Sequence, residues 1–69
     1  METKWMGGFE IKVISENGEA VISANREGLL SLAEHLKALA EGKPGDHVHY
    51  DEHNALVAGS AELIIEKVR

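Results

Sequence analysis

Four side chains that can bind a metal, carry a proton or contact a partner stand at alternate positions of one short segment. They are His47, His49, Asp51 and His53. Residues at i, i+2 and i+4 of an extended strand point to the same side. The segment could therefore present two imidazoles and a carboxylate in a row, with a third imidazole beyond them. Such a row coordinates an ion, contacts another molecule, or is a solvated strand surface, and the spacing is compatible with all three.

The metal interpretation requires the strand to stay extended as far as Asp51. Imidazole together with carboxylate suits zinc and other first-row divalent ions. However, residues 51–54 have the composition of a turn, which would break the row. A structural zinc site needs four ligands and a catalytic one needs three plus water. We predict no bound cofactor, and we keep as the alternative a divalent-metal-binding or small hydrolytic domain that uses His47, His49 and Asp51.

Catalysis finds little other support in the sequence. Histidine is the usual acid–base group near neutral pH, but the chain has no cysteine and no nucleophile elbow. The loop at residues 42–45, Gly-Lys-Pro-Gly, does not match a phosphate-binding loop. A thin sheet with one helix also leaves little room for a substrate cleft. We therefore predict a binding protein that is not an enzyme.

Length and charge restrict the class of protein further. The 69 residues leave room for one domain, residues 1–69, with a thin core. The net charge of -5 argues against nucleic acid and against an anionic membrane as partners, and it suits solubility or docking onto a basic protein. The N-terminal residues lack the apolar region of a signal peptide, and no apolar run approaches the ~18 residues that a membrane span needs. The expected location is the cytoplasm.

The first half of the chain predicts a hairpin followed by a helix. Phe9, Ile11 and Val13 alternate with charged residues in a strand over 9–15. Asn17-Gly18 supplies the two positive φ angles of a type I′ turn, and a second strand covers 19–24.

A helix is expected over residues 26–41. Asn25 is the expected N-cap of this helix, and Gly42 and Pro44 end it. Gly28 marks either close packing or a frayed first turn. One apolar stripe at helical spacing should face the core. It comprises Leu29, Leu32, Ala33, Leu36, Leu39 and Ala40.

The second half predicts two more strands, over 46–50 and 61–68, joined by a long connection. Val48 and Tyr50 should point inward, toward the helix. The order β-β-α-β-β indicates an α+β fold: an antiparallel sheet of about four strands with one helix packed on one face. One helix can cover only one face of the sheet, so the opposite face is either polar or covered by another molecule. A homodimeric structural module is therefore a further alternative. Trp5, Met6 and Ile14 are candidates for extra apolar surface there.

Three stretches of the chain resemble the Imm32 family of small bacterial immunity proteins, which belong to polymorphic toxin systems. They are residues 25–33 (NREGLLSLA), 45–51 (GDHVHYD) and 59–67 (GSAELIIEK). The resemblance spans roughly residues 25–68. One departure from the family pattern is Asp46, which stands between Gly45 and His47.

The resemblance implies a cytoplasmic antidote that binds and neutralises a cognate toxin in bacteria. It gives the motif positions no individual roles. These positions are His47, His49, Asp51, Gly59, Ser60, Glu62 and Leu63. We predict that the toxin contacts His47, His49, Asp51 and His53, on the exposed face of the sheet. The acidic net charge would favour a basic nuclease as that toxin.

Overall fold

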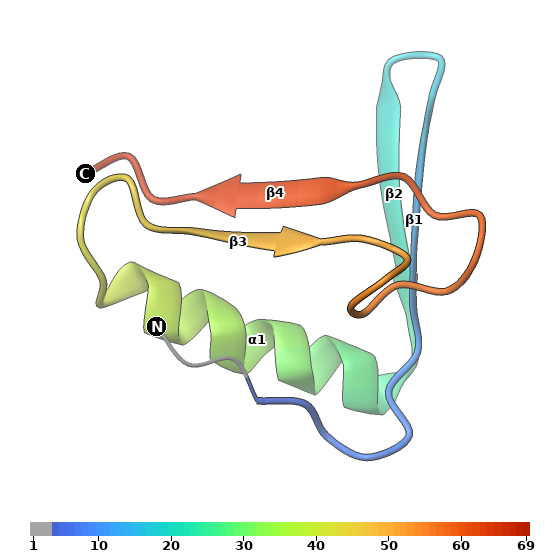
Figure 1. Cartoon of the computed structure of the whole chain (residues 1–69), viewed down its shortest axis with the longest axis horizontal. Coiled ribbons are helices and arrows are strands. Elements are labelled where there is room, and N and C mark those ends of the chain that lie inside the picture. Colours follow the sequence, from blue (N-terminus) through green and yellow to red (C-terminus); the bar gives the residue numbers. More distant parts are fainter. Residues whose placement is uncertain (1–3) are drawn as a thin grey trace.

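The computed structural model describes residues 4–69, which form one helix and four strands (Figure 1). The elements are β1 (Ile11–Glu16), β2 (Glu19–Ala24), α1 (Arg26–Ala40), β3 (His47–Tyr50) and β4 (Leu63–Glu66). The α+β class and the element order are as predicted. Residues 1–3, part of the stretch in which no signal peptide is expected, lie outside the described residues. In the part that is described, no helix is long and apolar enough to cross a membrane.

The four strands form two separate antiparallel hairpins, β1–β2 and β3–β4, where one continuous sheet was expected. The reason lies on the second edge of β1, which the connection between β3 and β4 occupies. Val57 N donates to Ile11 O at 3.0 Å, and Ala61 N donates to Val13 O at 2.8 Å. The Ser60 hydroxyl accepts from Val13 N at 3.2 Å. These bonds join the hairpins through a loop, so β3 and β4 never reach the edge of β1.

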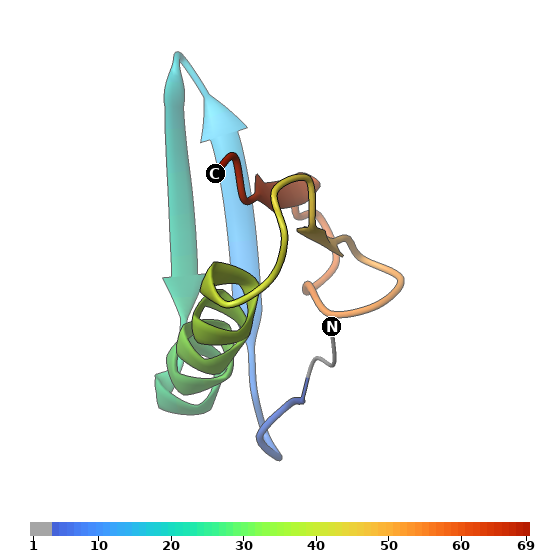
Figure 2. The same cartoon turned by 90° about the vertical axis from the view of Figure 1, so that its left-hand side faces the viewer.

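The two hairpins run in different directions. β3 and β4 lie alongside α1, whereas the β1–β2 hairpin stands across the end of the helix at which α1 begins (Figures 1 and 2). The Asn17-Gly18 turn has φ angles of 53° and 78°, as a type I′ turn requires. The core lies where the base of this hairpin, α1 and β3 meet. Its buried apolar residues are Ile11, Val13, Leu32, Leu39, Val48, Tyr50 and Leu56.

The helix buries a different face from the predicted stripe. Leu32 and Leu39 are buried as expected, but Leu29 and Leu36 are 53% and 42% exposed, and Ala33 and Ala40 are exposed as well. The face that is buried instead carries Gly28, Ser31 and His35.

Contacts with the N-terminal segment explain this rotation of the helix. Met6 N donates to Ser31 Oγ at 2.9 Å, and His35 Nε2 bonds Lys4 O at 2.6 Å. A Cβ on Gly28 would lie 2.6 Å from Glu10 O. Close packing, rather than fraying, is therefore the reason for this glycine. Polar and small residues face the core here because a backbone segment, not a sheet face, packs on them.

Asn25 connects the start of the helix to the segment just before β1. Its side-chain oxygen accepts from Gly28 N at 2.8 Å, which confirms the predicted N-cap, and also from Glu10 N at 2.9 Å. Its amide Nδ2 donates to Gly8 O at 2.8 Å. At the other end, Glu41 is the C-cap residue. One asparagine thus joins the first turn of the helix to residues 8–10.

Candidate functional site

The outer face of the β3–β4 hairpin carries the first two histidines of the predicted row. Val48 and Tyr50 are only 4% and 2% exposed and point into the core, so the intervening His47 and His49 point outward, as expected. The register places His47 opposite Glu66 and His49 opposite Ile64. Opposed residues of an antiparallel pair share a face. This face of the hairpin therefore holds two imidazoles, a carboxylate and an isoleucine.

His49 stands between two carboxylates. Its Nε2 lies 3.3 Å from Glu62 Oε2 and 3.8 Å from Asp51 Oδ2. The three side chains are 42%, 70% and 24% exposed, so solvent screens their charges. The carboxylates orient the ring without burying it. The pairing with Glu62 was not predicted, because the register of β4 against β3 cannot be read from the sequence.

Asp51 shapes the turn that ends β3. Its Oδ1 accepts from His53 N at 2.8 Å and from Asn54 N at 3.1 Å, as an Asx turn does. Asn54 Oδ1 accepts from Asp51 N at 3.0 Å, and its Nδ2 donates to His49 O at 2.9 Å. The predicted turn is therefore present. Only the second carboxylate oxygen of Asp51 faces His49.

The row therefore ends where β3 ends. His53 lies in the turn and is exposed. Within residues 4–69, no group of three or more His, Asp or Glu side chains is arranged to hold a metal ion. The structure brings His49 and Asp51 together, keeps His47 beside them on the same strand face, and sets His53 apart.

An exposed apolar side chain lies among these polar groups. Ile64 is 59% exposed, whereas its neighbours Leu63 and Ile65 are partly buried against the core. Because His49 lies directly opposite Ile64, an imidazole and an aliphatic side chain share the middle of the face. An apolar centre inside a polar rim is the usual anatomy of a protein-binding surface. We call the set His47, His49, Asp51, Glu62, Ile64 and Glu66 the outer face.

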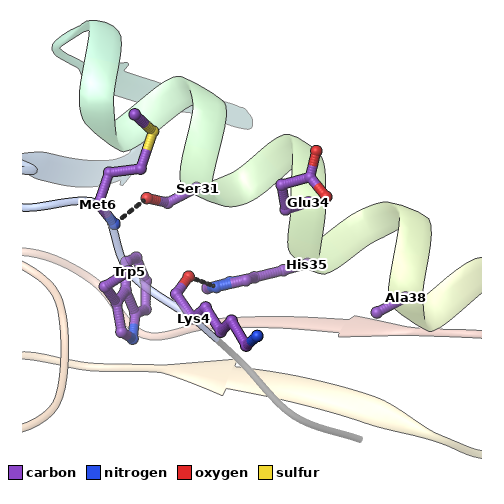
Figure 3. Close-up of a pocket in the computed structure, with 7 residues that line it drawn as sticks. All are labelled: Lys4, Trp5, Met6, Ser31, Glu34, His35 and Ala38. Atoms are coloured by element: carbon purple, nitrogen blue, oxygen red, sulfur yellow. Dashed lines mark hydrogen bonds between the residues drawn. The ribbon is translucent and has the colours of Figure 1, made fainter.

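The fourth histidine, His35, is buried next to a pocket of about 250 Å³ (Figure 3). Its Nδ1 lies 2.8 Å from Tyr50 Oη, and its Nε2 lies 2.6 Å from Lys4 O. The Trp5 ring packs edge-on against the imidazole, with 4.5 Å between the ring centroids. Both ring nitrogens are thus bonded within the protein. We interpret His35 as a structural residue that ties the N-terminal segment to α1 and β3.

Tyr50 completes this buried arrangement. Its side chain is 2% exposed, and burial raises the pKa of its phenol above the usual 10.0. Lys4 O can only accept a hydrogen bond, so Nε2 of His35 donates to it, and in the neutral imidazole Nδ1 accepts from Tyr50 Oη. The sequence predicted that Tyr50 points inward, but it could not indicate that a helix histidine would receive its hydroxyl.

The fold and the outer face define a small α+β protein with a mixed polar and apolar surface on its β3–β4 hairpin. The family model described as Immunity protein 32 matches residues 19–68, so the chain belongs to this family of immunity proteins. The match runs from β2 to the end of β4 and includes the whole outer face. It confirms the resemblance seen in the sequence. Searches of curated proteins and of solved structures gave no match.

Proposed function

We propose that the protein is a non-enzymatic immunity protein that binds a cognate toxin directly and so neutralises it. The observation that carries this proposal is its membership of the Immunity protein 32 family. Neutralisation by binding requires a surface that excludes water around a few strong contacts, and it requires no catalytic group. The toxin and this antidote would meet in the bacterial cytoplasm.

We propose the outer face, together with His53, as the contact surface for the toxin. Ile64 supplies apolar area at 59% exposure, and His49 lies opposite it with its ring held by Glu62. Imidazole both donates and accepts hydrogen bonds. The strand fixes the backbone at His47 and His49, and Glu62 contacts the His49 ring, so ordering these groups on binding costs less entropy than ordering a loop would. His53 extends the surface from the adjacent turn.

The charge of the chain supports a basic toxin, of which a nuclease is one kind. The net charge is -5, and the outer face carries three carboxylates, Asp51, Glu62 and Glu66. Complementary charge accelerates association and makes it depend on ionic strength. A basic toxin should therefore bind more slowly as salt is added, with a smaller change in the dissociation rate.

The test begins with co-purification. A tagged copy is expressed in its native host, and the proteins retained at moderate salt are identified. The expected result is one stoichiometric partner that is toxic when it is expressed alone and harmless with this protein. A preparation without such a partner, under conditions that induce the neighbouring genes, would contradict the proposal.

Paired variants then locate the surface. Ile64→Ala and His49→Ala should each weaken toxin binding by about tenfold or more, the size of a central interface contact. Ile14→Ala is the matched control, because Ile14 is also an exposed strand isoleucine, at 38%, but lies on the other hairpin. Thermal unfolding of each variant checks that the fold is kept. Equal loss of binding in Ile14→Ala and Ile64→Ala would refute the outer face as the contact surface.

A further inference from the structure

Strand β2 is exposed along almost its whole length. Residues 19–23 are all exposed, and Val21 and Ile22 are 46% and 43% accessible. The neighbouring β1 buries Ile11 and Val13. Figure 2 shows the hairpin with β2 on its outer side, and within residues 4–69 the sheet contains only these two strands. β2 is therefore an edge strand with apolar side chains.

The register identifies which backbone groups point away from β1. Glu16 and Glu19 flank the two-residue turn, so they form a hydrogen-bonded pair, and such pairs alternate along the ladder. Val21 and Ser23 therefore also bond to β1, and Ala20, Ile22 and Ala24 direct their N–H and C=O groups outward. The other edge of β1 fits this alternation, because Ile11 and Val13 bond the loop at residues 57–61. No hydrogen bond between described residues reaches Ala20 or Ile22.

This open edge lacks the usual protection. Proteins guard edge strands with lysine, proline, inward charges or bulges. Residues 20–24, Ala-Val-Ile-Ser-Ala, contain no charge and no proline, and the pairing with β1 has no bulge. An isolated two-stranded ribbon is marginally stable in water. The outer half of the β1–β2 hairpin, from Ile14 to Val21, is exposed and would gain from further strands.

We propose that β2 pairs with β2 of a second copy of the chain around a two-fold axis, which joins the two hairpins into one four-stranded sheet. The register that uses all three outward residues places Ile22 opposite Ile22, and Ala20 opposite Ala24. Each such pair exchanges two N–H···O bonds. The interface is isologous and therefore closes as a dimer.

Charge complementarity points to a second copy as the occupant. The turn end of the hairpin carries Glu16 and Glu19, and the opposite end of β2 leads to Asn25 and Arg26. Antiparallel pairing sets the turn end of one copy beside the Arg26 end of the other. Glu19 then lies opposite Asn25 and next to Arg26, whose side chain is 74% exposed and also contacts Glu27 of its own chain at 3.4 Å. The two-fold axis repeats this contact between Glu19 and Arg26 at both ends of the strand, within copies that each have a net charge of -5.

The dimer is independent of toxin binding. The edge of β2 and the outer face belong to different hairpins, so one surface stays accessible when the other is used. Failure of either proposal would leave the other standing.

The first test measures mass in solution. Light scattering and sedimentation of the full chain should give about 15 kDa, twice the 7.5 kDa of one chain. Ala20→Pro removes an outward N–H, and Ile22→Lys places a charge on the edge, so each should return the protein to a monomer. Ile64→Lys is the matched control and should remain dimeric. A monomer at every concentration, or a dimer that both edge variants leave intact, would overturn the proposal.

A cross-link tests the register without relying on a disruptive variant. The chain has no cysteine, so Ile22→Cys introduces a single thiol at the two-fold axis. Hydrogen-bonded pairs have Cα atoms ~5.5 Å apart, within disulfide range. Mild oxidation should link Ile22→Cys into a covalent dimer far faster than Ile64→Cys. Equal rates would refute the pairing.

Charge reversal tests the contact at the strand ends. Arg26→Glu should weaken the dimer several-fold, the size of an exposed ion pair, and Glu19→Arg combined with it should restore dimerisation. If the double variant is no better than Arg26→Glu alone, Glu19 and Arg26 do not meet and the proposed register is wrong.

Discussion

Replacing Tyr50 by phenylalanine tests the buried histidine directly. The change removes one oxygen from a side chain that is 2% exposed and leaves the rest of the buried ring in place. His35 Nδ1 then loses the donor that lies 2.8 Å away, while Nε2 remains bonded to Lys4 O. A buried acceptor left without a partner costs about 1–3 kcal/mol. For a domain of this size, each kcal/mol lowers Tm by about 4–8 °C.

The assay is urea unfolding, followed by fluorescence. Trp5 is the only tryptophan, and it packs against His35 and Tyr50, so its emission reports this part of the core. The midpoint should fall while the slope stays constant. Tyr50→Phe should cost much less in a His35→Leu background, because the acceptor is already gone. A loss below about 0.5 kcal/mol, or additive losses in the double variant, would refute the hydrogen bond as a source of stability.

Three further predictions concern the same core and the helix start. Burial raises the pKa of Tyr50 in the folded state above 10.0, so the contribution of this residue to folding stability is complete below pH ~10 and declines as the pH rises toward the raised pKa. The phenolate absorbance of this single tyrosine follows the titration, and a titration curve with an unshifted pKa would contradict the prediction. Gly28→Ala should destabilise the fold by up to about 2 kcal/mol in urea unfolding, because the new Cβ would meet Glu10 O at 2.6 Å; if helix propensity dominated, it would stabilise by about 1 kcal/mol instead. Asn25→Ala should cost about 2 kcal/mol by thermal unfolding, and Asn25→Asp, which keeps the accepting oxygen, should cost less; equal losses would refute the cap.

Features fixed by neighbouring residues were predictable. The Asn17-Gly18 turn, the Asn25 cap and the inward positions of Val48 and Tyr50 follow from φ preferences, hydrogen-bonding capacity and the alternation of a strand. The same alternation correctly placed His47 and His49 on one face. In each case the physical cause lies within a few residues, so the sequence alone was sufficient.

Features that depend on distant segments were not predictable. The sheet is divided because Val57 and Ala61 bond the edge of β1, and the sequence of a loop does not show that it will act as a strand partner. The helix is rotated because Lys4 and Met6 bond to polar residues on it, which a search for apolar periodicity excludes from the core. The position of Glu62 beside His49 depends on the register between β3 and β4, and no local signal sets that register.

The number of ring nitrogens that form hydrogen bonds divides the four histidines into a structural residue, His35, and three candidate binding residues. Both nitrogens of His35 are bonded in the core, so substitution there should change stability first and binding only as a consequence. His47 and His53 are exposed and have no ring hydrogen bond within residues 4–69, and His49 has one screened contact with Glu62. Substitutions at these three should leave Tm nearly unchanged, since surface changes are usually within about 0.5 kcal/mol. A loss of toxin binding at constant Tm would therefore be attributable to contact alone.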